Sequence, residues 1–193
     1  MPLCGSPGSR GVVAPTWQDG EVVWETASPQ ETEAIGERLG RLLEPGDVLA
    51  LAGALGTGKT VLVRGVVAGL GGQPADVHSP SFTLANEYPV APPAATGLGP
   101  RRVRGFAHLD LYRIRDAEEL PGIGWDSYLT ATWIVAVEWA ERAGGWLPPD
   151  HLWIGLERLG DMQRRIQARS AGPRSGALLR AWAASGESPR TCS

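Results

Sequence analysis

Short apolar runs, separated by amphipathic or glycine-rich stretches, follow one another along most of this chain. Residues 48–52 form an unbroken apolar run with the length of a strand that is buried on both faces. Residues 61–70 are apolar nearly all round, with Arg64 as their one charge, and Gly71 after them provides a helix stop. The pattern therefore predicts a buried strand, a glycine-rich loop and a buried helix in succession.

The flanking segments predict further strands and helices. Ser28, Pro29 and Glu31 form a capping box with proline at the first helical position, which predicts a helix that runs from there to about Leu43. Strands are predicted at 21–26, at 106–113 and at 132–137, the last ending at Glu138. Residues 79–83 are expected to lead into a further strand that runs through Tyr88. Short helical pieces are predicted at 117–120 and 125–129, a β-hairpin at 152–156 and 162–168 around Gly160-Asp161, and a last helix at 177–184.

Composition divides the chain into a central domain and peripheral segments. We expect residues 1–19 to be a flexible leader, 20–184 one domain and 185–193 a flexible tail. Residues 89–104 are rich in Pro, Ala and Gly and are expected to be a mobile insertion within the domain. We expect the arginines of the insertion to be solvated rather than in contact with RNA. They are Arg101, Arg102 and Arg104.

The overall charge and the cysteine content narrow the class of protein. A chain of 193 residues can form one domain with a substantial core. The net charge of −3 is not that of a free-standing nucleic-acid binder, and no apolar run reaches membrane-spanning length. The N-terminus lacks the apolar core of a secretory signal, and Cys4 and Cys192 have no metal-ligand partner near them in the sequence. We therefore expect a reduced, cytoplasmic protein that does not bind membranes.

The loop between the predicted strand and helix carries the clearest chemical signal. Residues 53–60 read Gly-Ala-Leu-Gly-Thr-Gly-Lys-Thr, which is the phosphate-loop pattern. Backbone N–H groups of such a loop surround phosphate oxygens at the positive end of the helix. Lys59 is the only lysine of the chain, and it stands where the pattern needs a compact cation for the β- and γ-phosphates. The expected nucleotide-binding stretch is Gly53, Ala54, Leu55, Gly56, Thr57, Gly58, Lys59, Thr60 and Val61.

Two acids are candidates for the remaining chemistry. Glu138 ends the apolar strand that begins at Trp133, in the manner of a Walker B acid, and Asp110 lies on another apolar strand. An acid at the carboxyl end of a buried strand points into the crevice where α/β folds bind ligands. The Thr60 hydroxyl and Glu138 are therefore expected to hold Mg²⁺, while Lys59, Asp110 and Glu138 serve catalysis. The alternative for either acid is a carboxylate that caps a turn.

Several blocks together resemble the TsaE family, the bacterial ATPases of tRNA threonylcarbamoyladenosine synthesis. Besides the phosphate loop, the blocks are residues 79–84, 108–113, 119–124 and 137–139, in the order and spacing of that family. The resemblance covers roughly residues 20–170. It implies an α/β fold made of a single P-loop NTPase-like domain, with a mixed sheet flanked by helices. It also implies Mg²⁺-dependent ATP hydrolysis that supports the TsaB–TsaD complex, which modifies a tRNA adenosine beside the anticodon.

The resemblance also implies roles for individual residues. Asp110 is similar to a family acid needed for hydrolysis, and Ser81 and Thr83 lie in a switch-like loop. Trp139 is expected beside the nucleotide, although a simply buried tryptophan is the alternative, and Arg165 matches an arginine that approaches the nucleotide. The chain departs from the family at Ala54, where an aspartate is usual, so a side-chain contact is expected to be lost.

Other functions share a phosphate loop. A small-molecule or nucleotide kinase needs an acceptor pocket and usually an arginine-bearing lid, for which only the proline-rich insertion is available. A GTPase needs a second lysine, which this chain lacks. A regulatory module that binds nucleotide without turning it over remains an alternative. Arg113 is a candidate for an arginine supplied in cis to the phosphates, with a surface salt bridge as its other interpretation.

Overall fold

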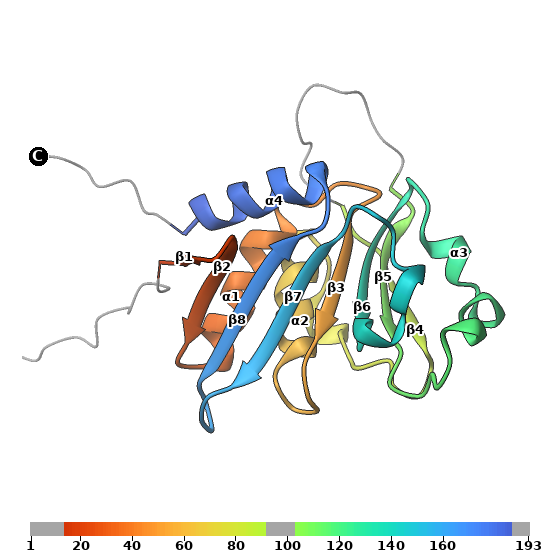
Figure 1. The fold of residues 1–193 in the computed structure, drawn as a ribbon, viewed down its shortest axis with the longest axis horizontal. Coiled ribbons are helices and arrows are strands. Elements are labelled where there is room, and N and C mark those ends of the chain that lie inside the picture. Colours follow the sequence, from red (N-terminus) through yellow and green to blue (C-terminus); the bar gives the residue numbers. More distant parts are fainter. Residues whose placement is uncertain (1–13, 92–102, 187–193) are drawn as a thin grey trace, which may run out of the picture.

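A computed structural model describes residues 14–91 and 103–186 of the chain. One sheet of eight strands runs through this part, in the order β1-β2-β8-β7-β3-β6-β5-β4 (Figure 1). The strands are β1 (Thr16–Gln18), β2 (Glu21–Thr26), β3 (Val48–Ala52), β4 (Ala85–Tyr88), β5 (Gly105–Asp110), β6 (Trp133–Glu138), β7 (Leu152–Arg158) and β8 (Arg164–Ser170). The helices are α1 (Pro29–Gly40), α2 (Lys59–Gly69), α3 (Trp125–Tyr128) and α4 (Pro173–Ala184), with 3-10 turns at Pro74–Asp76, Ala117–Ile123, Ala140–Arg142 and Gly144–Trp146.

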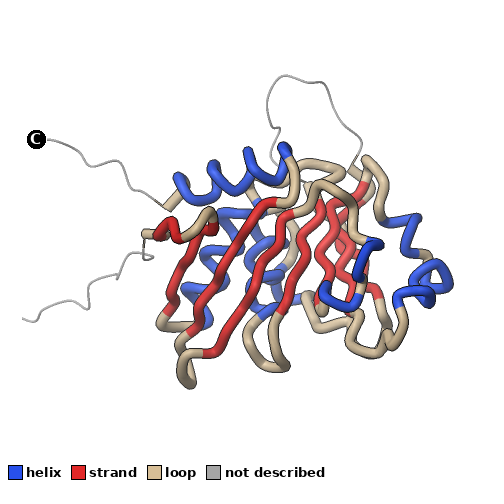
Figure 2. The backbone as a smooth tube through the Cα atoms, viewed as in Figure 1, coloured by secondary structure: helices blue, strands red, loops and turns tan. Residues whose placement is uncertain are grey.

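The sheet is mixed, as the resemblance implied. Strand β3 pairs parallel with β6 on one side and with β7 on the other, and β5 pairs parallel with β6. The outer pairs, β1–β2, β2–β8, β4–β5 and β7–β8, are antiparallel. Because β3, β5 and β6 run in the same direction, their carboxyl ends meet at one edge of the sheet, where the loop before α2 also lies (Figures 1 and 2).

Alternation along the strands divides the core into two parts. Leu49 and Leu51 of β3 belong to the larger cluster, which contains the apolar faces of α1, α2 and α4. Val48 and Ala50 point to the other face and join a second cluster with α3 and the neighbouring 3-10 turns. The long helices therefore cover one face of the sheet, and α2 lies directly under the strand that carries the phosphate loop.

Helices α1 and α2 approach unusually closely. A Cβ atom added to Gly65 of α2 would lie 1.9 Å from the carbonyl oxygen of Glu33 in α1, and one added to Gly36 of α1 would lie 2.2 Å from the carbonyl oxygen of Leu62. Gly40 and Gly69 continue the same contact one turn further along. The position of the helix that carries Lys59 and Thr60 is thus set by backbone-to-backbone packing.

Several element boundaries differ from those predicted. Strand β5 ends at Asp110 and not at residue 113, because the Asp110 carboxylate accepts the backbone N–H of Tyr112 at 2.7 Å and turns the chain. Helix α1 ends at Gly40 instead of about Leu43. Helix α4 begins at Pro173 and not at residue 177, with the proline in its first turn.

Strand β1 was not predicted and lies within the expected leader. It pairs with β2 through a two-residue turn, Asp19-Gly20, in which both residues have positive φ angles. Ordered structure therefore begins within residues 1–19. Cys4, Cys192, Arg101 and Arg102 lie outside the described residues, as do most of the insertion and the tail. In the part of the chain that the structure describes, no helix has the length and apolar character needed to cross a membrane.

Candidate functional site

The glycine loop joins the end of β3 to the start of α2 in a conformation that requires glycine. Gly53, Gly56 and Gly58 have φ angles of 136°, 78° and 104°. A side chain at Gly53 would in addition place its Cβ 2.4 Å from the carbonyl oxygen of Leu156 in β7. The Thr57 hydroxyl closes the loop by donating to the Ala54 carbonyl at 2.9 Å. The backbone conformation is therefore built for close approach of a ligand to main-chain N–H groups.

The Lys59 ammonium lies inside this loop. Its Nζ donates to the carbonyl oxygens of Gly53 at 2.7 Å and of Ala54 at 3.1 Å, and it lies 4.4 Å from the centroid of the Trp139 ring. Burial lowers the pKa of the Lys59 side chain from its ordinary value, and the charges of Glu138 and Asp110 offset part of that shift. A partly desolvated cation beside backbone carbonyls can exchange these contacts for phosphate oxygens.

Thr60 and Glu138 meet directly, as the sequence predicts for a metal site. The Thr60 hydroxyl donates to Oε1 of Glu138 at 2.9 Å, and the same oxygen lies 2.9 Å from Nε2 of His108. Burial alone would raise the pKa of Glu138, but the hydrogen bond and the charge of His108, the hydrogen bond from Thr60 and the charge of Lys59 outweigh it, so that the pKa lies below its ordinary value. Glu138 is therefore an ionised carboxylate in a buried site.

The donors at this point suit Mg²⁺. A hydroxyl and a carboxylate are hard oxygen ligands, and Mg²⁺ in phosphate-transfer sites takes one or two protein ligands while phosphates and waters complete its shell. Among residues 14–91 and 103–186 there is no cluster of three or more His, Cys, Asp or Glu side chains that could hold a metal alone. The pair Thr60 and Glu138 thus fits a nucleotide-bound Mg²⁺ rather than a metal held by the protein alone.

Asp110 lies next to Glu138 but has different partners. The two residues are paired in register on the parallel strands β5 and β6. Oδ2 of Asp110 accepts hydrogen bonds from the hydroxyls of Ser79 and Ser81, which belong to the loop that enters β4. Asp110 therefore tethers the loop that the sequence identifies as switch-like, at the same edge of the sheet as the glycine loop.

Trp139 follows Glu138 in a left-handed conformation, with a φ angle of 57°. Its ring contacts Lys59 and lies 5.3 Å from the guanidinium of Arg142 and 5.2 Å from the ring of Tyr112, measured between centroids for the two rings. Arg142 in turn donates to the carbonyl oxygens of Tyr112 and Ile114, and so fixes the segment that follows Asp110. The tryptophan is only partly buried and covers the Lys59 side of the loop.

The hairpin β7–β8 places two adjacent arginines on opposite faces of the sheet. Arg165, the predicted nucleotide contact, forms ion pairs with Glu25 at 2.8 Å and Glu157 at 3.6 Å on the face away from α2. Arg164 points to the face of α2, where its Nη2 lies 3.5 Å from the carbonyl oxygen of Gly56. The arginine of this hairpin that meets the glycine loop is therefore Arg164, because strand alternation turns Arg165 away.

Arg113 does not form the surface salt bridge considered as its alternative role within the described part of the chain. Its guanidinium lies 4.4 Å from the ring centroid of Phe82, a side chain that is 83% exposed. Phe82 belongs to the loop that Asp110 tethers, and Arg113 follows β5, the strand that carries Asp110. Arg113 therefore lies beside the switch-like loop.

Sequence reasoning missed His108, Arg142 and Arg164. The period of two along β5 offered a signal for His108, because residues 108 and 110 of a strand point to the same face. Arg164 carried the same kind of signal, because it alternates with Ile166 along β8, whereas Arg142 is fixed by tertiary contacts and carried no local signal.

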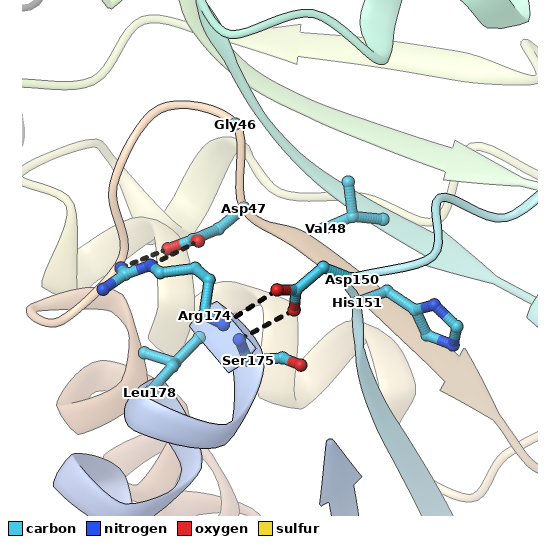
Figure 3. Close-up of a pocket in the computed structure, with 8 residues that line it drawn as sticks. All are labelled: Gly46, Asp47, Val48, Asp150, His151, Arg174, Ser175 and Leu178. Atoms are coloured by element: carbon cyan, nitrogen blue, oxygen red, sulfur yellow. Dashed lines mark hydrogen bonds and ion pairs between the residues drawn. The ribbon is translucent and has the colours of Figure 1, made fainter. Parts of the chain in front are cut away.

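A cavity of about 140 Å³ lies at the far end of β3, away from the glycine loop (Figure 3). There Asp150 accepts the backbone N–H groups of Arg174 and Ser175, both at 2.8 Å, and the Arg174 guanidinium pairs with Asp47. These contacts satisfy the first turn of α4 and join it to the start of β3. The two carboxylates of this cavity, Asp47 and Asp150, are engaged with Arg174 and Ser175, so these contacts anchor α4.

Comparison with known proteins gives a consistent result. The family model described as "Threonylcarbamoyl adenosine biosynthesis protein TsaE" matches residues 26–166. The tRNA threonylcarbamoyladenosine biosynthesis protein TsaE of Bacillus subtilis is 36% identical over 80% of this chain and 89% of its own, and that of Treponema pallidum is 37% identical over 72% and 93%. The crystal structure of Bacillus subtilis YdiB superposes with a TM-score of 0.67 at 30% identity, covering 86% of this chain and 97% of that one.

Proposed function

The chain belongs to the TsaE family of tRNA threonylcarbamoyladenosine biosynthesis proteins, and on this premise we propose that it is a Mg²⁺-dependent ATPase that supports the TsaB–TsaD complex. Its contact with tRNA is then indirect, through that complex, and its place of action is the cytoplasm. The observation that carries the proposal is the hydrogen bond between Thr60 and Glu138 at the mouth of a glycine loop that holds the only lysine of the chain.

The residues divide the work of binding and hydrolysis. Backbone N–H groups of residues 53–61 and the Lys59 ammonium bind the phosphates of ATP. Thr60 and Glu138 hold the Mg²⁺, which supplies neutralising charge at the phosphates when it is bound. Asp110 lies beside Glu138, and its hydrogen bonds from Ser79, Ser81 and Tyr112 leave one acceptor position on Oδ1, which would orient the attacking water.

The exposure of side chains near the glycine loop supports a requirement for a partner. Leu55 of the glycine loop and Phe82 of the switch-like loop are 79% and 83% exposed, so both side chains are open to solvent. Water around the γ-phosphate screens the electrostatic stabilisation of the transition state. Arg113 is the candidate for a cis arginine, and a docked complex would both exclude water and order the loop that carries Phe82. We expect slow turnover in isolation and faster turnover with TsaB–TsaD.

The test is a steady-state assay of phosphate release and of modified tRNA, in which each protein component and ATP are omitted in turn. TsaB–TsaD should raise the rate of phosphate release by about 10³ or more if it completes the site in the way that other activators of P-loop enzymes do. Modification over many rounds should require ATP. Unchanged phosphate release together with ATP-independent modification would leave nucleotide binding standing and contradict the assigned role.

A further inference from the structure

His108 is a buried polar residue whose hydrogen bond the proposed function has not used. It lies on β5 between Phe106 and Asp110 on the face that α2 covers, and its side chain is fully buried. Its Nε2 is 2.9 Å from Oε1 of Glu138, whereas its Nδ1 is the one buried side-chain nitrogen or oxygen without a hydrogen-bond partner in the described part of the chain. A buried polar atom without a partner destabilises a fold, and an apolar side chain at this position would avoid that cost.

The surroundings fix which ring nitrogen carries the proton. Oε1 of Glu138 already accepts the Thr60 hydroxyl at 2.9 Å, and a carboxylate oxygen can only accept hydrogen bonds. Nε2 is therefore the N–H that donates to Oε1, and Nδ1 is left without a hydrogen-bond partner. Nδ1 lacks a partner because the hydrogen bond from Nε2 to Glu138 fixes the orientation of the ring.

Both hydrogen bonds to Glu138 end on the same oxygen. Oε1 accepts from the Thr60 hydroxyl and from His108, while the described residues provide no hydrogen bond to Oε2. Two donors from different elements, one on α2 and one on β5, hold the carboxyl group in one orientation. Oε2 is thereby left free for another ligand.

We propose that His108 is a positioning residue of the Mg²⁺ site, which fixes the Glu138 carboxylate so that the free oxygen is presented to the metal or to a water bound to it. The proposal rests on the proposed function. Residues that orient a metal ligand from behind commonly change metal affinity by roughly 10-fold to 100-fold when they are replaced. His108 therefore acts on the metal through Glu138 and not through the phosphates.

The experiment compares His108→Gln with His108→Asn. Both replacements bury a neutral amide, so they should lower the free energy of unfolding by similar amounts. Only glutamine is long enough to place an N–H near the position of Nε2. Isothermal titration calorimetry measures the Kd of ATP for the wild type and both variants, once with Mg²⁺ and once with EDTA. The ratio of the two Kd values is the gain in affinity that Mg²⁺ provides, and thermal melts establish that each variant is folded.

We expect His108→Gln to keep most of this gain and His108→Asn to lose roughly 10-fold of it or more, with the Kd in EDTA within about twofold of the wild type for both. Equal gains in the wild type and both variants would overturn the inference, as would equal losses in both variants that extend to the Kd in EDTA. If the wild type itself shows no gain from Mg²⁺, the proposed function fails, which is a different result from equal gains.

A measurement on the wild type does not depend on the variants folding. Nitrogen-15 NMR of the ligand-free protein distinguishes a protonated from an unprotonated Nε2 in His108. A proton on Nε2 supports the inference. A proton on Nδ1 alone would overturn it, because the Nε2 lone pair would then face the carboxylate and could not orient it.

Discussion

Asp110 and Glu138 are paired side by side on parallel strands, yet their carboxylates bind different parts of the protein. Glu138 accepts from Thr60 on the phosphate-loop helix and from His108 within the sheet, whereas Asp110 accepts from Ser79 and Ser81 of the switch-like loop. One acid is thus connected to the expected metal site and the other to the switch-like loop before β4. Removing the Glu138 carboxylate is therefore expected to affect the Mg²⁺ dependence of ATP binding, and removing the Asp110 carboxylate is expected to affect the rate of hydrolysis.

Replacing Glu138 by alanine should weaken the dependence of ATP binding on Mg²⁺. Thr60 would lose its acceptor and the metal its carboxylate, while the backbone N–H groups that hold the phosphates would remain. Calorimetric titration with Mg²⁺ and with EDTA should give Kd values that differ much less than in the wild type. A variant that keeps the full gain from Mg²⁺ would show that Glu138 is not at the metal.

Replacing Asp110 by alanine should leave ATP bound but slow its hydrolysis. A carboxylate that positions or activates a nucleophile typically contributes about 10²–10⁴-fold to the rate. The measurement is single-turnover phosphate release, with the Kd of ATP determined separately. Ser81→Ala removes one tether of the same loop but leaves the carboxylate in place, so it serves as the control and should slow turnover less. If Asp110→Ala abolished Mg²⁺-dependent binding instead, the two acids would have to exchange roles.

Much of the fold could be predicted from the sequence because its signals are local. The apolar run of β3, the glycines of the loop and the stop at Gly71 each depend on neighbours along the chain, and the structure has them where predicted. The hairpin β7–β8 follows from alternation in the same way. Strand β1 carried a local signal too, in Asp19-Gly20, but its three residues are too few to show a period.

The site was less predictable where it depends on tertiary contact. Asp110, Glu138, Lys59 and Thr60 come together because parallel strands end at one edge, a regularity that the sequence pattern captures. Whether Arg164 or Arg165 reaches the glycine loop depends on which face of β8 lies toward α2. A shift of one residue in the strand register would exchange the two arginines between the faces of the sheet. The resemblance to the family predicted Arg165 as the arginine near the nucleotide, whereas the register of β8 places Arg164 at the glycine loop.

Replacing Gly65 by alanine should destabilise the fold although alanine favours helices. Helix propensity alone would stabilise α2 by about 1 kcal/mol. The added methyl group, however, would lie 1.9 Å from the backbone of Glu33, so that α1 and α2 would have to separate. Overpacking of this kind costs about 1–3 kcal/mol, and we expect a net loss in the free energy of unfolding measured by urea denaturation.

Gly122→Ala is the matched control for this prediction. A Cβ atom at Gly122 has nothing within 4 Å, so its replacement should change the free energy of unfolding by no more than about 0.5 kcal/mol. Equal effects of the two substitutions, or a stabilising Gly65→Ala, would contradict the close crossing of α1 and α2.

Asp150 should contribute stability that disappears in acid. Burial opposes the shift, but the hydrogen bonds from Ser175 and the backbone N–H of Arg174 outweigh it and hold the pKa of Asp150 below its ordinary value (Figure 3). A lowered folded-state pKa gives stability that is present above the unfolded pKa of about 3.9 and is lost as the pH falls through the folded value. Asp150→Ala should therefore lower the free energy of unfolding by about 1 kcal/mol at pH 7, as loss of a helix cap does.

The same comparison at several pH values tests the cause. The difference between the wild type and Asp150→Ala should shrink as the pH falls below about 4, because the wild-type carboxylate becomes protonated there. Asp161→Ala removes an exposed carboxylate that pairs with Arg158 on the surface, and it should have little effect at any pH. A difference that is independent of pH would mean that the charge of Asp150 is not what stabilises α4.

Lys59→Ala should abolish tight ATP binding while leaving the fold intact. The ammonium group is the cation inside the glycine loop, and its loss removes a charge-assisted contact of roughly 1.5–3 kcal/mol, which weakens binding by about 10-fold to 150-fold. The side chain contacts the carbonyl oxygens of Gly53 and Ala54 and the ring of Trp139, not the apolar core, so the loss of stability should be small. Calorimetry and a thermal melt measure the two effects separately.

Arg64→Ala tests whether the effect is specific to Lys59. Arg64 lies on the same helix but donates to the carbonyl oxygen of Val77, away from the loop. Removing this second cation of α2 changes the net charge of the helix by the same amount, yet it should leave the Kd of ATP within about twofold because no phosphate contact is lost. If both substitutions weakened binding equally, the contribution of Lys59 would be a general effect of charge on the helix. If Lys59→Ala bound ATP as tightly as the wild type, the loop would not be the phosphate site.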